Sequence, residues 1–312
     1  VLQELNVPVI KAILNYYSTI EEWSESLQGL RAMDVTVNVA QPEFDGMLVG
    51  VPVGFRDPAG RDPRTGASIA HFVPNEERIC KLVRLALNWA RLKHIPSSKR
   101  RIAIIFHNYP PRDDQIGTAI GLDSPQSVCR ILHRMAEEGY SLDWLPEDGQ
   151  DLMKRLLLAA TNERRYYSME SLQKRAHARV SSGLYRSWFE ELLPSVQEQM
   201  MASWGTPPGT LMACDNSLII PGIRNGNTFI GMQPPRGLLE NPAAIYHSPD
   251  LPIPHHYYAY YRWIRDVFCA NLVMHIGKHG TLEWLPGKSV GLSERCYPDI
   301  VISDLPNIYP YI

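Results

Sequence analysis

The sequence predicts an α/β protein in which parallel, doubly wound sheets carry flanking helices. Short apolar, β-branched segments alternate with segments that have apolar residues at helical spacing, as expected for βα units. The continuous apolar run at 101–106 predicts a strand buried on both faces, and a loop and a capped helix follow it. A helical insertion is predicted over 148–204, with a break at Pro194.

The first 94 residues predict two strands and two helices. Residues 7–13 and 35–40 are rich in β-branched residues or alternate in hydrophobicity, so we expect strands there. Residues 18–30 predict a helix with a Ser/Thr cap, a Glu three residues further on and an end at Gly29. Residues 75–94 predict a long helix. Its apolar residues recur at helical spacing, at Ile79, Leu82, Val83, Ala86, Trp89 and Ala90.

The rest of the chain predicts further βα units. Ser124 is expected to cap a helix that has Pro125 in its first turn and stops at Gly139. Other strands are expected at 210–215, 227–234 and 268–277, and a helix at 255–268. We place a domain boundary before residue 95. Residues 1–94 would then be the end of a preceding α/β domain plus the long helix, and 95–312 an α/β domain that carries the functional site.

Composition limits the classes of function. The chain has 312 residues, 45% hydrophobic and 21% charged, with a formal net charge of −2. No bulk charge attracts nucleic acid or a membrane surface, and no apolar run approaches the roughly 20 residues that span a bilayer. The five cysteines are far apart without a CxxC pair, so we expect reduced thiols and a cytoplasmic location. Because the chain starts without Met and stops abruptly, we interpret it as an internal fragment.

Three predicted strands run into long loops rich in Pro, Gly, His, Arg and Asp. The first loop contains His107, Arg112, Asp113 and Asp114. The second contains Arg236, His247, Asp250, His255 and His256. The third contains His275, His279 and Glu283. Ligands bind beyond the carboxyl ends of the strands in an open parallel sheet, so we expect these loops to converge on one polar site.

The third loop offers the most specific pattern, His275, His279 and Glu283 at intervals of four residues. Two imidazoles and a carboxylate suit a divalent metal such as Co²⁺, Ni²⁺ or Zn²⁺, and the same groups suit proton transfer near neutral pH. Spacing alone leaves a third interpretation open, a polar loop with a capping His and a solvent-facing Glu. The pattern is not HExxH, and the chain has neither a P-loop nor a GxSxG elbow. A zinc hydrolase is therefore disfavoured.

The second loop suits a substrate with carboxylates. Arg236 within QPPRG is placed as in a bidentate carboxylate clamp, and an ordinary surface arginine is the alternative. One of His255 and His256 is expected to cap the following helix and the other to face the site. The tyrosines of this region suit an aromatic wall for a flat ligand, or ordinary helix packing. In the first loop, adjacent aspartates are more typical of a turn than of catalysis.

The segment HIGKHGTLEWLPGK resembles the signature of the CobN/magnesium-chelatase large-subunit family, H-x-G-x-H-G-x-x-E-[WF]-[LM]-P-G-K. Every fixed position is met, by His275, Gly277, His279, Gly280, Glu283, Trp284, Leu285, Pro286, Gly287 and Lys288. Further blocks resemble the family at 41–46, 104–128, 226–237, 246–263 and 296–312. Family members are much longer, in agreement with the fragment interpretation.

The resemblance implies a subunit that binds a tetrapyrrole and the divalent metal to be inserted, a ligase forming nitrogen–metal bonds. Partners would be AAA+ ATPase and integrin-like chelatase subunits, which hydrolyse the ATP; ATP is not expected to bind here. Trp284, Leu285 and Lys278 favour the cobalt branch, which inserts Co²⁺ into hydrogenobyrinic acid a,c-diamide in cobalamin biosynthesis. The alternative is the magnesium branch, which inserts Mg²⁺ into protoporphyrin IX. We expect the isolated fragment to be inactive.

The resemblance also suggests roles for individual residues. His275, His279 and Glu283 would bind the metal and accept pyrrole protons. Residues expected to bind the tetrapyrrole are His107, Arg112, Arg236, His247, His255 and Lys288. Two other classes of function stay open: a module that binds tetrapyrrole or docks the ATPase without its own chemistry, and a metallohydrolase.

Overall fold

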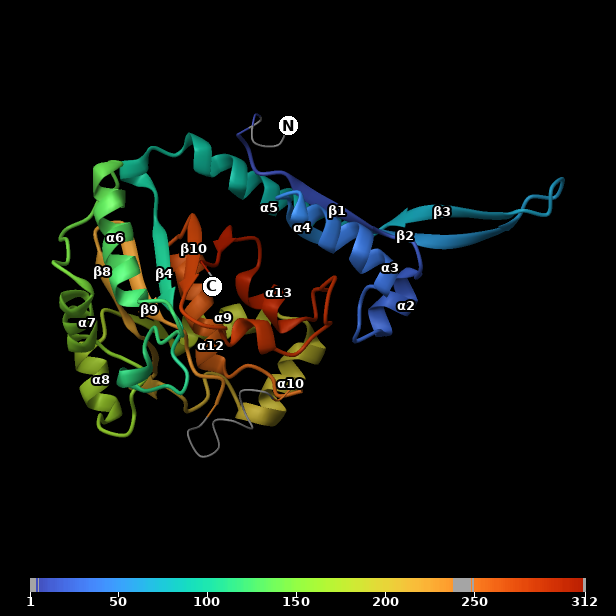
Figure 1. The fold of residues 1–312 in the computed structure, drawn as a ribbon. Helices are drawn as coiled ribbons and strands as arrows, with labels where there is room; N and C mark the ends of the chain where they lie inside the picture. The colour runs from blue at the N-terminus through green and yellow to red at the C-terminus, as the bar shows by residue number, and fades with distance from the viewer. Residues whose placement is uncertain (1–3, 5, 238–247, 249, 311–312) are drawn as a thin grey trace. The chain divides into compact units, whose positions relative to one another are not determined.

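The computed structural model describes residues 4, 6–237, 248 and 250–310 (Figure 1). The chain divides into two compact units, which are treated separately below. Unit 1 comprises Val1–His94 and Gly287–Asp304, and unit 2 comprises Ile95–Pro286 and Leu305–Ile312. The fold is mixed α/β with three sheets among the described residues. The α/β class is thus confirmed, but the sheets are not purely parallel, since each contains an antiparallel pair.

Unit 1 is built on a three-stranded sheet in the order β1-β2-β3. β1 (Ile10–Asn15) runs parallel to β2 (Leu48–Arg61), and β2 forms an antiparallel pair with β3 (Ser68–Pro74). The described helical segments of unit 1 are α2 (Ile20–Glu25), α3 (Ala32–Val35), the π-turn Thr36–Ala40, α4 (Gln41–Phe44), α5 (Glu76–His94) and α13 (Tyr297–Ile302). α2 begins with the predicted capping box, because Thr19 accepts from the Glu22 amide and Glu22 accepts from the Thr19 amide.

The strand predicted at 35–40 is wrong, because this segment is helical and continues from α3 into α4. The helical conformation places Asp34 and Asn38 on one buried face, where the Asn38 amide donates to Asp34 Oδ1 over 3.3 Å. Asp34 Oδ1 also accepts from the Tyr16 amide at 3.1 Å. These tertiary contacts outweigh the β-propensity of the valines, which is a weak preference.

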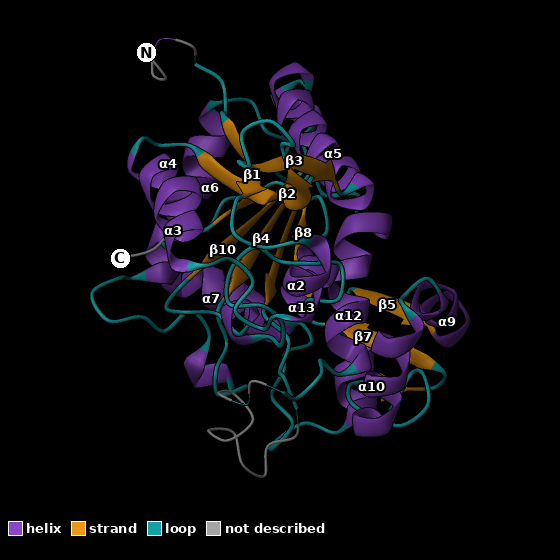
Figure 2. Ribbon diagram, turned by 90° about the vertical axis from the view of Figure 1, so that its right-hand side faces the viewer, coloured by secondary structure: helices purple, strands orange, loops and turns teal. Residues whose placement is uncertain are grey.

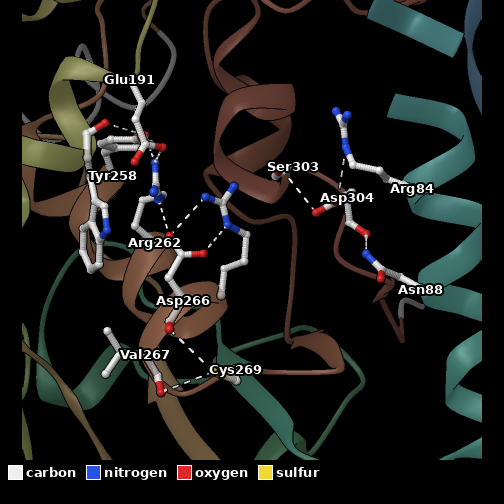
Figure 3. A network of polar contacts seen from close by, with 12 residues as sticks. Arg84, Asn88, Glu191, Tyr258, Arg262, Asp266, Val267, Cys269, Ser303 and Asp304 are labelled. Atoms are coloured by element: carbon white, nitrogen blue, oxygen red, sulfur yellow. Dashed lines mark hydrogen bonds and ion pairs between the residues drawn. The ribbon is translucent and has the colours of Figure 1, made fainter. Parts of the chain in front are cut away.

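The long helix α5 forms as predicted, but only part of its apolar stripe is covered: Leu82 and Trp89 are half-buried. Val83 is 51% exposed, and Ile79 and Leu87 are also exposed. Two basic residues of the helix are buried and form ion pairs. Arg78 Nη1 lies 3.1 Å and Lys81 Nζ 2.8 Å from Asp299 Oδ1. On the same helix, Arg84 and Asn88 bind Asp304, as Figure 3 shows. Ion pairs therefore fix α5 on unit 1, and helical periodicity alone does not reveal which face is inside.

Unit 2 contains a five-stranded sheet in the order β11-β10-β4-β9-β8. Its strands are β11 (Asn307–Ile308), β10 (Leu272–Ile276), β4 (Ile102–Phe106), β9 (Thr228–Met232) and β8 (Gly222–Asn225). The first four are mutually parallel, and only β8 is antiparallel to its neighbour. Ile276 pairs with Phe106, and Phe106 with Met232, so three strands end level at one edge. This register confirms the predicted convergence of the three strand ends.

Helices cover both faces of this sheet (Figure 1). On one face α6 (Ser124–Glu137) and α7 (Gly149–Leu158) pack onto the sheet through a continuous apolar core. That core includes Ile104, Val128, Leu132, Leu152, Leu156 and Ile230. On the other face lies α12 (His255–Arg262); a Cβ added at Gly231 would come within 2.1 Å of Tyr260 Oη. The N-cap of α6 is Asp123 and not the predicted Ser124, because the Asp123 carboxylate accepts from the Gln126 amide.

The insertion is helical as predicted, but it also contributes to a small sheet (Figure 2). Its elements are α7, α8 (Met169–Arg175), β5 (Ala178–Ser181), α9 (Ser182–Glu190) and α10 (Pro194–Trp204). β5 pairs with β7 (Ser217–Ile220), which in turn pairs with β6 (Ala213–Cys214). β5 and β7 were not predicted, because four-residue strands show no period of their own and are stabilised by non-local pairing.

The end of α12 is tied to the insertion by one buried arginine (Figure 3). Arg262 Nη1 donates to Glu191 Oε2 and Tyr258 Oη over 2.8 and 2.7 Å, and its Nε donates to Asp266 Oδ2 over 2.6 Å. A π-turn at Trp263–Val267 continues the helix.

Short 3-10 turns occur at Ser97–Lys99, Asp113–Gln115 and Leu282–Trp284. Within the described ranges, no helix has the length and apolarity needed to cross a bilayer.

Candidate functional site

The carboxyl ends of the parallel strands of unit 2 enclose a cavity of about 90 Å³. It is lined by His107, Gln233, His275, Ile276, Gly280, Leu282, Glu283, Asn307 and Tyr309. His107 follows β4, Gln233 follows β9, His275 lies in β10 and Asn307 begins β11. Four adjacent parallel strands thus each contribute a polar side chain to one site, as expected beyond the carboxyl ends of an α/β sheet.

The backbone continues the strand pairing just beyond the sheet edge, which fixes these residues. The His107 amide donates to Ile276 O over 2.9 Å, and the Gln233 amide donates to Phe106 O over 2.8 Å. Gly277 has φ +132°, and a Cβ there would lie 2.8 Å from the His107 Cβ. At Gly280 a Cβ would lie 3.0 Å from Gln233 Oε1. Gly277 and Gly280 therefore allow close approach of residues from the neighbouring strands.

A directed chain of hydrogen bonds passes behind the cavity. The Thr281 amide donates to Gln233 Oε1 at 2.7 Å, and Gln233 Nε2 donates to Tyr261 Oη at 3.3 Å. Tyr261 Oη lies 2.9 Å from His275 Nε2, and His275 Nδ1 lies 2.8 Å from Asn307 Oδ1. Because the Asn307 carbonyl oxygen only accepts, Nδ1 carries the proton and Nε2 accepts from Tyr261. Burial lowers the pKa of His275 to about 4, so the ring is neutral at pH 7.

The ring of His107, unlike that of His275, lacks well-formed hydrogen bonds. The residue is only 3% exposed, and neither ring nitrogen has a well-formed hydrogen bond to the described residues. Burial lowers the pKa of His107 to about 4, and Lys278 adds to this shift, while the backbone of Tyr109 opposes it. The neutral ring therefore lines the cavity, and its buried nitrogens have no well-formed hydrogen bond to a described residue.

His279 and Glu283 form an exposed pair. Their Nδ1 and Oε2 atoms lie 2.7 Å apart, and their side chains are 55% and 36% exposed. Glu283 also lines the cavity, so this pair connects the cavity with solvent. Among the described residues no group of three or more His, Cys, Asp or Glu side chains is placed to hold a metal ion. Both ring nitrogens of His275 are hydrogen-bonded, to Tyr261 and Asn307, so a metal set of His275, His279 and Glu283 stays a prediction.

Other residues predicted to bind substrate do not line the cavity. Arg112 is exposed and paired with Asp114, with Nε 2.8 Å from Oδ1. Arg236 is buried and donates to the carbonyl oxygens of Ser248 and Leu251 over 3.0 and 3.3 Å. His247 lies outside the described residues.

The paired histidines at 255 and 256 are structural. His255 Nδ1 contacts Tyr185 Oη at 2.7 Å and its Nε2 contacts Gly205 O at 2.9 Å. His256 Nε2 contacts Ile219 O at 2.9 Å, and burial lowers its pKa to about 4. The N-cap of α12 is Pro254. Neither histidine caps the helix or lines the cavity, contrary to the prediction, because His255 is buried against Tyr185 of the insertion and His256 against β7.

Lys288 belongs to unit 1, where its ammonium group lies at the C-terminal end of α2. Nζ donates to the carbonyl oxygens of Trp23, Ser24 and Ser26 over 2.6, 3.0 and 2.6 Å. It also lies 5.1 Å from the centre of the Trp23 ring. A cation at a helix C-terminus satisfies carbonyls that have no partner within the helix.

Sequence reasoning did not single out Gln233, Tyr261, Asn307 or Tyr309. Gln233 directly follows β9, so its place at a carboxyl strand end was an available signal, whereas Asn307 begins the two-residue strand β11 and had none. Tyr261 was visible only as one tyrosine among several in α12. Its hydrogen bond to His275 depends on how α12 packs on the sheet, and helical spacing does not give that.

The sheet and its strand-end cavity define an α/β protein with a polar site built on a His-x3-Glu pair and buried imidazoles. Residues 1–312 match the CobN/Magnesium Chelatase family, and the chain belongs to this family. An uncharacterized protein of Methanocaldococcus jannaschii is 49% identical over 311 residues, which are 100% of this chain and 25% of that protein. The aerobic cobaltochelatase subunit CobN of Pseudomonas aeruginosa is 39% identical over 98% of this chain and 24% of its own length.

A solved structure is also similar. The catalytic subunit of cobaltochelatase from Mycobacterium tuberculosis aligns with a TM-score of 0.84 and 37% identity, over 100% of this chain and 26% of that one. The chain thus spans about a quarter of the length of these relatives.

Proposed function

We propose that this chain is the tetrapyrrole- and metal-handling part of an ATP-dependent cobaltochelatase large subunit. The reaction would insert Co²⁺ into hydrogenobyrinic acid a,c-diamide, in the cytoplasm. The observation that supports this is the position of the family signature: its His279–Glu283 pair opens onto the same cavity as the buried, neutral His107. AAA+ ATPase and integrin-like subunits would supply the energy of ATP hydrolysis.

The chemistry of the site suits metal insertion. A carboxylate and an imidazole, both reachable from solvent, can replace water around an incoming divalent cation, which is the substrate. The cavity of about 90 Å³ is well below the roughly 300–1,000 Å³ of pockets that enclose drug-sized ligands. The macrocycle would therefore present its edge or face to the cavity rather than enter it. Arg112, exposed beside the site loops, suits a peripheral carboxylate of the ring.

The cobalt branch is favoured over the magnesium branch by sequence. The signature reads Trp284–Leu285 after the glutamate and Lys278 between the histidines, as in the cobalt branch. The cobaltochelatase relatives named above support the same choice. Insertion of Mg²⁺ into protoporphyrin IX is the competing function.

A binding titration tests the proposal. The 312-residue chain is titrated with hydrogenobyrinic acid a,c-diamide and with protoporphyrin IX, each with and without Co²⁺, and absorbance is recorded. We expect at least tenfold tighter binding of the corrin precursor. Preference for protoporphyrin would move the chain to the magnesium branch, and binding of neither ring would overturn the proposal.

Substitution of the exposed pair tests whether the chain takes part in the chemistry. Glu283→Gln and His279→Ala are each expected to lower metal insertion by the reconstituted complex about 100-fold or more. Glu294→Gln, on an exposed residue of unit 1, is the matched control. If both site variants insert metal as fast as the wild type and still bind the tetrapyrrole, the chain acts only as a binding module.

A further inference from the structure

Two buried imidazoles lie at the ends of neighbouring strands, and only one is free to react. His275 donates from Nδ1 to Asn307 and accepts at Nε2 from Tyr261, so its lone pair is occupied. His107 lines the same cavity, and neither of its ring nitrogens is well bonded to the described residues. The family signature contains His275 and does not contain His107, so the signature alone does not single out His107.

A buried imidazole without a well-formed hydrogen bond is costly. Leaving a buried polar group without a partner costs about 1–3 kcal/mol, so such groups are rare outside functional sites. Here the fold holds the ring in place: the His107 amide and carbonyl are fixed by Ile276 O and the Gly117 amide at 2.9 and 2.7 Å. Gly277 leaves the space that its Cβ occupies. The ring, which has no well-formed hydrogen bond, is therefore positioned by the backbone on the wall of the cavity.

We propose that His107 is the proton acceptor of the metal-insertion step and that His275 is a positioning residue; this inference rests on the proposed function. A pyrrole N–H bond of the ring breaks, and the nitrogen lone pair forms the bond to the metal. The proton passes to a free ring nitrogen of His107, which becomes an imidazolium. It then leaves toward solvent through the Glu283–His279 pair at the cavity mouth. No electron is transferred, so no redox partner is required.

The environment of His107 agrees with this role. Its pKa of about 4 keeps the ring neutral at physiological pH, so the lone pair is available before the metal arrives. The imidazolium formed in this buried place is unstable, and the proton is therefore released rapidly. His275, by contrast, accepts a hydrogen bond from Tyr261, which in turn accepts one from Gln233. The His275 ring therefore sets the geometry of the cavity wall.

The first test compares two variants in the longest polypeptide that carries this chain, reconstituted with its ATPase partners. His107→Gln is expected to lower kcat for metal insertion about 100-fold, with the tetrapyrrole Kd changed less than threefold. Tyr261→Phe, which removes the donor to His275, is expected to lower kcat less than tenfold. The pH profile of the wild type should lose its acidic limb in His107→Gln and keep it in Tyr261→Phe.

The second test needs no turnover. In the 312-residue chain labelled with ¹⁵N-histidine, His275 should give a single Nδ1–H tautomer and His107 a mixture of both. Diethylpyrocarbonate should modify His107 before His275, and bound hydrogenobyrinic acid a,c-diamide should protect it. Thermal unfolding of each variant shows whether it is folded.

The outcomes separate the two proposals. Insertion by His107→Gln within threefold of the wild type, or a single fixed tautomer at His107, would overturn the role of His107 alone. A wild-type protein that binds tetrapyrrole but inserts no metal would overturn the proposed function and this inference together. A loss of more than 100-fold in Tyr261→Phe would reassign the proton transfer to His275.

Discussion

The hydroxyl of Tyr261 in α12 donates to His275 Nε2 in β10 over 2.9 Å, so a helix residue fixes the ring of a strand residue. Both side chains are buried. Replacing Tyr261 with Phe leaves the accepting nitrogen without its donor, and we expect the free energy of unfolding to fall by about 1–3 kcal/mol. Urea denaturation measures this change. Tyr166→Phe, at a tyrosine that is 77% exposed, is the matched control and should change stability by less than about 0.5 kcal/mol.

Gly277 provides a test of backbone geometry in the signature. Its φ of +132° is unfavourable for any side chain, and an alanine Cβ would lie 2.8 Å from the His107 Cβ. We expect Gly277→Ala to cost about 1–3 kcal/mol of stability and to slow metal insertion by displacing His107. The control is Gly183→Ala in α9, where no atom lies within 4 Å of the added Cβ. Equal stability of the two variants would show that Gly277 is not needed for this close approach.

The sequence predicts the parts of this site that are local. The strand at 101–106 follows from its continuous apolar run, whereas the hydrogen bond between His279 and Glu283 is known only from the structure. The convergence of the strand ends follows from the rules for parallel sheets. The signature shows that its glycines matter, but only the structure shows that Gly277 and Gly280 face His107 and Gln233.

The parts that could not be predicted depend on packing between distant segments. The occupied nitrogens of His275 depend on Tyr261 and Asn307, which lie 14 and 32 residues away. The burial of Arg78 and Lys81 in α5 depends on Asp299, more than 200 residues away, and helical spacing does not reveal that contact. Residues 35–40 were predicted as a strand because a local pattern cannot include the contact between Tyr16 and Asp34.

Lys288 distinguishes two roles for the last residue of the signature. Its ammonium group binds three carbonyl oxygens at the end of α2 and lies over Trp23. Hydrogen bonds to charged groups contribute about 1.5–3 kcal/mol, so Lys288→Met should lower the melting temperature by several degrees. Lys93→Met, on an exposed lysine of α5, is the control. A variant of normal stability that binds tetrapyrrole more weakly would instead support the predicted contact with a ring carboxylate.

The buried histidines predict how stability changes with pH. The pKa values of His256 and His275 are about 4 in the folded protein, whereas an unfolded chain has the ordinary value of 6.5. Between these pH values the unfolded state binds protons that the folded state does not, so acid favours unfolding. Their contribution to stability is complete above pH 6.5 and is lost as the pH falls toward 4.

The magnitude makes this pH dependence measurable. Each such histidine should add a slope of about 1.4 kcal/mol per pH unit to the free energy of unfolding across that window. Urea denaturation followed by tryptophan fluorescence at pH 7, 6 and 5 gives the slope. His256→Gln keeps a donor near Ile219 O. It should reduce the slope of the free energy of unfolding against pH by the contribution of one histidine. An unchanged slope would mean that His256 does not stay neutral in the folded protein.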